Sequence, residues 1–235
     1  MEFKAPVLTK ASMENNIDTK EIEREVVIKS AELRNIPIIS KAFDMLDKLP
    51  DYLRYHTKDH TEDVFHEAIM FGLLDSVKEK DLEMIAVSAV WHDTGFLIRK
   101  DDNEIEAVKL FKEEAIDSNI NYVDDVEKMI LDTKLMLTKD GPEAIASHPL
   151  SSYLLDADVS NLGRTDFREK LNLMAEELKI NMQDHTDRLK FLKFTLSLLK
   201  NKIWYTDAAR RLRQKQQLLN IEELEKEIEE LEKVK

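Results

Sequence analysis

Apolar residues recur at helical spacing along most of the chain, and the alternation typical of strands is scarce. Residues 20–49 are predicted to form two helices, which are broken near Pro37 and ended by Pro50. Further helices are predicted at residues 61–74, 81–94, 103–117, 122–137, 149–158, 164–178, 186–201 and 206–233. This pattern predicts an all-α fold in which the helices pack as a bundle.

The helix predicted at residues 81–94 ends in two metal-binding side chains on its inward face. The apolar stripe leads directly to His92 and Asp93, at positions where hydrophobic residues are expected. Gly95 is then expected to stop the helix. The residues of the stripe are Leu82, Ile85, Ala86 and Ala89.

Two other predicted helices depart from the pattern in the same way. His60 heads the inward face of the helix at 61–74. Asp158 continues the apolar stripe of the helix at 149–158, whereas Asp156 lies about 200° around that helix. We therefore expect Asp158, and not Asp156, to point inward. The two stripes consist of Val64, Ala68 and Phe71 and of Leu150, Leu154 and Ala157.

These four side chains have one economical common explanation. A lone buried histidine is usually a hydrogen-bonded core residue, and a single aspartate near a helix end is usually a cap. Two buried carboxylates beside two imidazoles are costly unless a cation neutralises them. His60, His92, Asp93 and Asp158 are therefore predicted to converge on one divalent metal ion.

Length and composition agree with a helical domain that has a charged surface. The 235 residues are 43% hydrophobic and 35% charged, with only four glycines and five prolines. We divide them into an N-terminal arm at 1–19, one domain at 20–215 and a charged amphipathic helix at 216–235.

The net charge and the missing cysteines exclude several kinds of protein. A net charge of −13 opposes binding to duplex nucleic acid or to an anionic membrane surface, although a small nucleotide in a local positive pocket is compatible with it. Without cysteine there are no disulfides, thiolate metal sites or cysteine nucleophiles. No apolar run is long enough to span a membrane, and the first ten residues do not form a signal peptide. A cytoplasmic location is expected.

The C-terminal segment carries apolar residues at the spacing of a short coiled coil. Two heptads are too few to be stable alone, so two interpretations stand side by side. The helix lies along its own domain, or it provides the contact of a homodimer. The four apolar positions are Ile221, Leu224, Ile228 and Leu231.

Three motifs resemble those of the HD-domain superfamily of metal-dependent phosphohydrolases. They read YHTKDHTEDV, VWHDTGF and DADVSNLGR, within about residues 52–165. The tyrosine-histidine and ADVSN stretches are similar to class I cyclic nucleotide phosphodiesterases. The last motif also resembles bacterial HD proteins with a DADLDYLGR-like motif, and that likeness continues through KNKIWYTDAARRLRQKQ. The combination is specific, whereas the pair HD alone is weak.

The resemblance implies roles for the residues that match. His60, His92, Asp93 and Asp158 match the metal ligands, Asp93 also orienting the attacking water. His56 matches the histidine that protonates the leaving oxygen. The mixed nitrogen and oxygen donors favour Mn²⁺ or Fe²⁺, with Zn²⁺ and Mg²⁺ as alternatives.

Some positions depart from the relatives or match them weakly. Thr57 replaces an asparagine of the phosphodiesterases, and Asn103-Glu104 replaces a histidine-glutamate pair of the bacterial group. Glu104 and Thr133 are interpreted as residues that support the ligands without binding the metal. Lys134 and Arg164 are candidates for contacting a substrate phosphate.

The function implied is hydrolysis of a phosphoester in a small, nucleotide-like substrate by a metal-activated water. The main alternative is a catalytically silent HD domain that binds a nucleotide or a protein partner. A di-iron oxygenase is disfavoured, because only His148 lies between the HD pair and Asp158 to provide further ligands.

Overall fold

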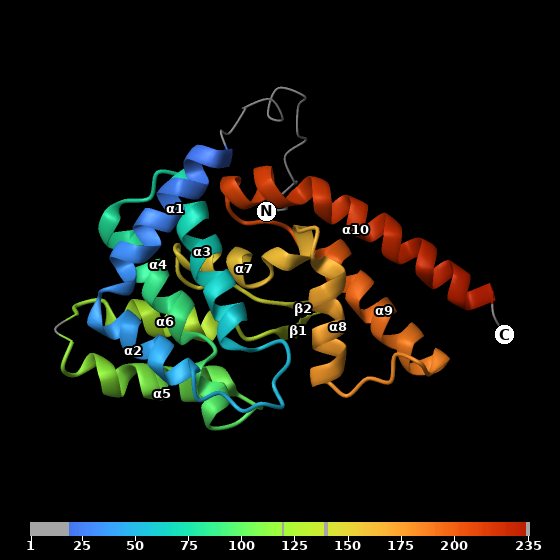
Figure 1. The fold of residues 1–235 in the computed structure, drawn as a ribbon, viewed down its shortest axis with the longest axis horizontal. Coiled ribbons are helices and arrows are strands. Elements are labelled where there is room, and N and C mark those ends of the chain that lie inside the picture. Colours follow the sequence, from blue (N-terminus) through green and yellow to red (C-terminus); the bar gives the residue numbers. More distant parts are fainter. Residues whose placement is uncertain (1–18, 119, 139–140, 234–235) are drawn as a thin grey trace.

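The computed structural model describes residues 19–233, apart from residues 119 and 139–140, and it is built almost entirely of helices (Figure 1). The elements in chain order are α1 (Thr19–Arg34), α2 (Pro37–Leu46), α3 (Lys58–Leu74), α4 (Glu79–Trp91), η2 (Thr94–Leu97), α5 (Asn103–Ala115), α6 (Val123–Asp132), β1 (Met136–Thr138), β2 (Gly141–Glu143), α7 (Ser151–Asp158), η3 (Ser160–Gly163), α8 (Phe167–Glu177), α9 (His185–Asn201) and α10 (Asp207–Lys233). The all-α prediction is confirmed.

One predicted helix is shorter than its apolar pattern suggests. The helix expected at 122–137 ends at Asp132, and an antiparallel hairpin of β1 and β2 follows, with Met136 opposite Glu143. Gly141 and Pro142 are the poorest helix formers in this stretch. The predicted N-terminal arm at 1–19 lies outside the described residues, except that Thr19 begins α1.

Helix α3 lies at the centre of the fold, where it packs against α1, α4 and α7. Phe65 and Ile69 belong to a core that α3 shares with α2, α4, α5 and α6. Ala68 and Phe71 belong to a second core, shared with α4, α7 and the start of α10. Helix α3 is therefore buried on two faces. Full burial of the Phe65 side chain alone stabilises the fold by about 1.5–3 kcal/mol. His60 at its N-terminal end is thereby held between α4 and α7.

Helix α10 runs without interruption through the boundary expected near residue 215. Leu224 and Ile228 are buried in a third core, formed with α8 and α9. His185 Nε2 also lies 2.8 Å from the Leu231 carbonyl oxygen. The heptad positions of the C-terminal segment therefore pack along their own chain (Figure 1). No helix in the described part of the chain has the length and apolar character needed to cross a membrane.

Candidate metal centre

His60 enters the interior from the first turn of α3. The helix starts after Thr57, whose hydroxyl accepts a hydrogen bond from the His60 backbone N–H at 3.4 Å. Thr57 therefore acts as an N-cap, which satisfies one of the free amides of the first turn. The His60 side chain is almost fully buried.

His92 and Asp93 lie at a bend between α4 and η2. The α-helix ends at Trp91, three residues before its expected end, and the Thr94 hydroxyl donates to the Trp91 carbonyl at 2.8 Å. Gly95 lies beyond the end of α4 and has a different role from the one expected. A Cβ atom at Gly95 would lie 1.8 Å from the Asn103 carbonyl oxygen, so glycine is needed for the close approach of α5.

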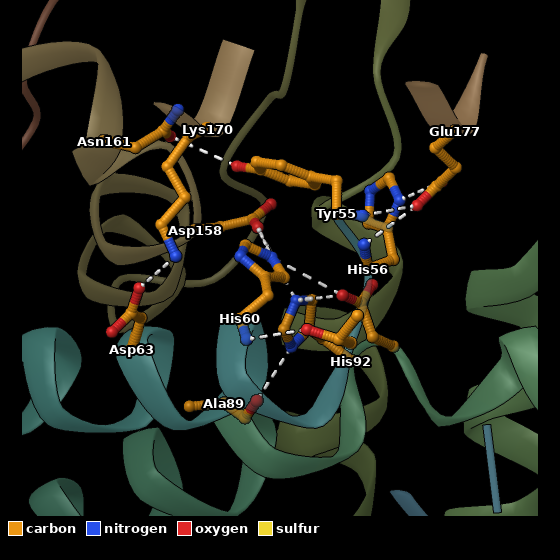
Figure 2. Close-up of polar contacts among 12 residues, drawn as sticks. Tyr55, His56, His60, Asp63, Ala89, His92, Asp158, Asn161, Lys170 and Glu177 are labelled. Atoms are coloured by element: carbon orange, nitrogen blue, oxygen red, sulfur yellow. Dashed lines mark hydrogen bonds and ion pairs between the residues drawn. The ribbon is translucent and has the colours of Figure 1, made fainter. Parts of the chain in front are cut away.

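The four predicted ligands converge, and Figure 2 labels three of them, His60, His92 and Asp158. His60 Nε2 lies 3.5 Å from Asp93 Oδ2 and 3.2 Å from Asp158 Oδ1. His92 Nε2 lies 3.1 Å from Asp93 Oδ2 and 3.5 Å from Asp158 Oδ1. Donor atoms of His60, His92 and Asp93 all lie within 4.8 Å of one another, as a shared metal ion requires. Two nitrogens and two oxygens from three helical elements thus face one point.

The hydrogen bonding of the cluster fits a cation. His92 Nε2 and Asp93 Oδ2 are buried and have no hydrogen-bond partner among the described residues. His92 Nδ1 lies 2.7 Å from the Ala89 carbonyl oxygen, so Nδ1 carries the proton and donates it. In the neutral ring, the Nε2 lone pair is then directed into the cluster. An unpaired buried carboxylate oxygen is costly, and a divalent cation at this point would satisfy both atoms.

The charges of the cluster are strongly coupled. Burial opposes the charged form of His92, but Asp93 and Asp158 outweigh burial and raise the pKa of His92 well above its ordinary value. Burial also opposes ionisation of Asp158, yet the nearby His60 and His92 imidazoles hold its pKa far below the ordinary value. A metal ion binding here must displace the imidazole proton, so metal affinity should fall as the pH falls.

His56 lies beside the cluster and is paired with a residue that sequence reasoning missed. Its Nδ1 lies 2.6 Å from Glu177 Oε1, and Glu177 Oε2 accepts the backbone N–H groups of Arg54, Tyr55 and His56 at 2.9–3.0 Å. The His56 ring stacks on Phe96, with the ring centroids 4.5 Å apart. Nδ1 is thus engaged by Glu177, which leaves Nε2 as the nitrogen that can act on a substrate.

Glu177 and His56 keep each other charged. Burial lowers the pKa of His56, but the Glu177 hydrogen bond and the nearby Asp93 carboxylate raise it above its ordinary value. Burial raises the pKa of Glu177, but His56 and the backbone amides lower it to about 2. The only local signal for Glu177 is its place as the last residue of α8, where the helix dipole disfavours an acid. Glu176 lies in the same last turn of α8, so this signal does not single out Glu177.

Asp156 does not behave as expected for a residue that points away from the interior. Asp158 does face the cluster, but the Asp156 side chain is fully buried on another side of α7. It accepts hydrogen bonds from Lys202 Nζ at 2.8 Å, from the Tyr205 N–H at 3.1 Å, and from the Thr206 N–H and hydroxyl at 2.8 and 2.9 Å. The expectation that Asp156 does not point inward is therefore wrong, because the 202–206 segment covers that side of α7 as well.

The weaker candidates lie at the margin of the centre. Lys134 pairs with Asp102 on the surface, and the Thr133 hydroxyl donates to the Ile130 carbonyl of its own helix at 2.8 Å. Burial, with a contribution from the nearby Asp93 carboxylate, raises the pKa of Glu104. Glu104 is thus close enough to the predicted ligand Asp93 for their charges to interact.

Arg164 lies close to the cluster but is held by carboxylates. Its Nε donates to Asp166 Oδ1 at 2.9 Å, and a terminal nitrogen donates to Asp63 Oδ2 at 3.3 Å. Arg164 also lines a small cavity together with His60 and Asp158. It is therefore placed where it can meet a group bound beside the cluster.

Comparison of the chain with models of known protein families, with curated proteins and with solved structures finds no match. The function is therefore argued from the motifs and from the site itself.

Proposed function

We propose that this chain is a metal-dependent phosphohydrolase of the HD type, which hydrolyses a phosphoester of a small, nucleotide-like substrate. The observation that carries the proposal is the pair of buried ligand atoms, His92 Nε2 and Asp93 Oδ2. They lie 3.1 Å apart, make no hydrogen bond among the described residues, and face His60 and Asp158. A core built for stability alone leaves very few such atoms unsatisfied.

The residues of the cluster would hold one divalent cation, with Mn²⁺ or Fe²⁺ favoured over Zn²⁺ and Mg²⁺ because the donors are mixed imidazole and carboxylate. Once bound, such an ion polarises a phosphoryl oxygen and lowers the pKa of a water molecule. Asp93 has a second carboxylate oxygen, which would accept a proton from the attacking water and orient it. The buried walls around His60 and His92 would keep other water away from the reacting phosphorus.

His56 would act as the general acid. Its Nδ1 is held by Glu177 at 2.6 Å, and its raised pKa favours the protonated ring that a general acid needs. Nε2 would then donate that proton to the leaving oxygen of the ester. Stacking on Phe96 and the Glu177 hydrogen bond fix the orientation of the ring, so that little rearrangement is needed for the transfer.

The proposed substrate is a small phosphorylated molecule, most simply a nucleotide. The proposed location of the reaction is the cytoplasm. The net charge of −13 speaks against duplex nucleic acid as a partner. The motifs resemble enzymes that act on nucleotides, but base recognition depends on pocket shape, which the motifs do not encode.

The test is a screen of protein loaded separately with Mn²⁺, Fe²⁺, Zn²⁺ and Mg²⁺ against nucleoside mono-, di-, tri- and cyclic phosphates. We expect release of phosphate or opening of a cyclic ester with at least one metal, and no turnover in the presence of a chelator. Stoichiometric metal and nucleotide binding without turnover would contradict the proposal and support a silent HD domain. Two bound irons per chain would support an oxygenase instead.

A further inference from the structure

We propose that Lys170 and Arg164 form a subsite for a second phosphate group of the substrate, and that the Asp63 carboxylate occupies this subsite until substrate binds. The ligand class rests on the proposed function, because the subsite lies beside the candidate metal centre. The observations that carry the inference are the contacts, the shared cavity and the exposures of these three side chains.

Two cations converge on one carboxylate oxygen. Asp63 Oδ2 accepts a hydrogen bond from Lys170 Nζ at 2.8 Å and another from Arg164 at 3.3 Å. The three residues come from α3, from α8 and from the segment that follows η3. In the view of Figure 2, Lys170 and Asp63 lie on the opposite side of His60 from Glu177. Lys170 and the proposed general acid thus lie on two sides of His60.

The cationic pair and two metal ligands line the same cavity. His60 and Asp158 form part of its wall, and Asp63, Arg164 and Lys170 form another part. Its volume is about 10 Å³, which is at most enough for one water molecule. A phosphate group can therefore reach the two cations only if the Asp63 carboxylate moves out.

Asp63 is the member of the group that is free to move. Its side chain is 37% exposed, whereas the side chains of Lys170 and Arg164 are 17% and 20% exposed. A rotation of the Asp63 side chain on the surface of α3 would take the carboxylate into water, and phosphate oxygens would replace it as acceptors for Lys170 and Arg164. The cations would stay in place, because Arg164 is also held by Asp166.

The chemistry of the subsite suits phosphate. A guanidinium and an ammonium directed at one point bind phosphate oxygens through charge-assisted hydrogen bonds, and a carboxylate mimics part of such an anion. With a phosphoester at the metal centre, this subsite would select substrates that carry a second phosphate, such as nucleoside bisphosphates or diphosphates. A simpler role for the same contacts is an ion-pair bridge that fixes α8 to α3.

The two roles predict opposite effects of Asp63→Asn. If Asp63 occupies a phosphate subsite, its neutralisation removes a competitor and frees Lys170, while Arg164 keeps its Asp166 pair. Inorganic phosphate, titrated calorimetrically into metal-free and into Zn²⁺-loaded protein, should then bind D63N about tenfold more tightly than the natural chain, the gain of about one charge-assisted hydrogen bond. Adding Lys170→Met to D63N should abolish the gain.

Glu227 provides a matched control. It is also a carboxylate shared by two cations, Arg168 and Arg188, but it lies on α10 among α8 and α9. Glu227→Gln changes the net charge as D63N does and should leave phosphate affinity unchanged. Melting curves of all variants verify that each is folded.

Several results would overturn the inference. Unchanged or weaker phosphate binding by D63N would leave only the ion-pair bridge, and an equal gain in E227Q would show a mere effect of net charge. Because equilibrium binding is measured, the outcome does not depend on turnover. A protein that hydrolyses no phosphoester but shows the D63N gain would contradict the proposed function and leave the subsite standing.

Discussion

Asp156 and Asp158 are two residues apart on α7, and their surroundings could hardly differ more. Asp156 is fully buried, and its carboxylate accepts hydrogen bonds from Lys202 Nζ, from the backbone N–H groups of Tyr205 and Thr206, and from the Thr206 hydroxyl. The Asp158 side chain is 23% exposed and faces two imidazoles. Its cluster contains two buried ligand atoms that make no hydrogen bond within the described part of the chain. The Asp156 carboxylate lies among donors of its own chain. Asp158 accepts from His60 Nε2 at 3.2 Å but lies beside two buried atoms without a hydrogen bond to any described residue, His92 Nε2 and Asp93 Oδ2.

The comparison separates a structural charge from a functional one. A buried carboxylate that the fold surrounds with donors fixes the segments that supply them, here the 202–206 segment before α10. A carboxylate left beside other unpaired ligand atoms costs stability unless something outside the chain joins it. Neighbouring ligand atoms that make no hydrogen bond among the described residues, more than burial, therefore indicate which of the two aspartates serves the candidate site.

The largest effect is expected from Asp158→Ala. Loss of a ligand should weaken metal binding by more than about 100-fold, since even outer partners of ligands contribute about 10–100-fold. Turnover should fall to the background rate. Metal content by mass spectrometry and a metal titration are the measurements, and retention of a stoichiometric ion would break the comparison.

The next largest effect is expected from His56→Ala, which should keep the metal and lose rate. A positioned proton transfer contributes about 10²–10⁴-fold, and the loss should reach this range on esters with a poor leaving group. It should shrink on p-nitrophenyl esters, whose leaving oxygen barely needs a proton. Metal content and both rates are measured together. Loss of the metal would make His56 a ligand, and equal losses on both substrates would make it a residue that positions the phosphate.

Asp156→Ala is the matched partner of the first substitution and should act on stability. It leaves the Lys202 ammonium, which is 12% exposed, without its partner and removes the acceptor for three further donors. Removing one member of a buried pair costs about 3–5 kcal/mol. Denaturant unfolding should show this loss, with metal binding at saturation retained in the folded protein. Metal loss equal to that of Asp158→Ala would refute the distinction between the two residues.

The smallest effect is expected from Glu177→Gln. Glu177 raises the pKa of His56, so removing its charge should lower that pKa and deprotonate the ring at a lower pH. The rate, which needs protonated His56, should therefore decline at lower pH in the variant than in the natural chain. At neutral pH the loss should be about tenfold, the lower end for a residue that supports another. An unshifted pH–rate profile would remove Glu177 from the mechanism.

The helices and the four candidate ligands could be predicted from the sequence because both rest on local patterns. Apolar spacing identifies a helix and its inward face, and His92, Asp93 and Asp158 were found as polar residues on such faces. The same count failed for the end of α6 and for the hairpin that follows, because a short apolar run does not distinguish a helix from a strand.

The partners of these residues were decided only by the tertiary structure. Glu177 meets His56 across 121 residues, Lys202 meets Asp156 across 46, and Lys170 meets Asp63 across 107. No spacing rule links residues so far apart, because their distance depends on how whole helices pack. The sequence by itself determined the helices and the faces that carry the four candidate ligands, and the packing of α3, α7 and α8 determined which further polar side chains are buried and which partners they find.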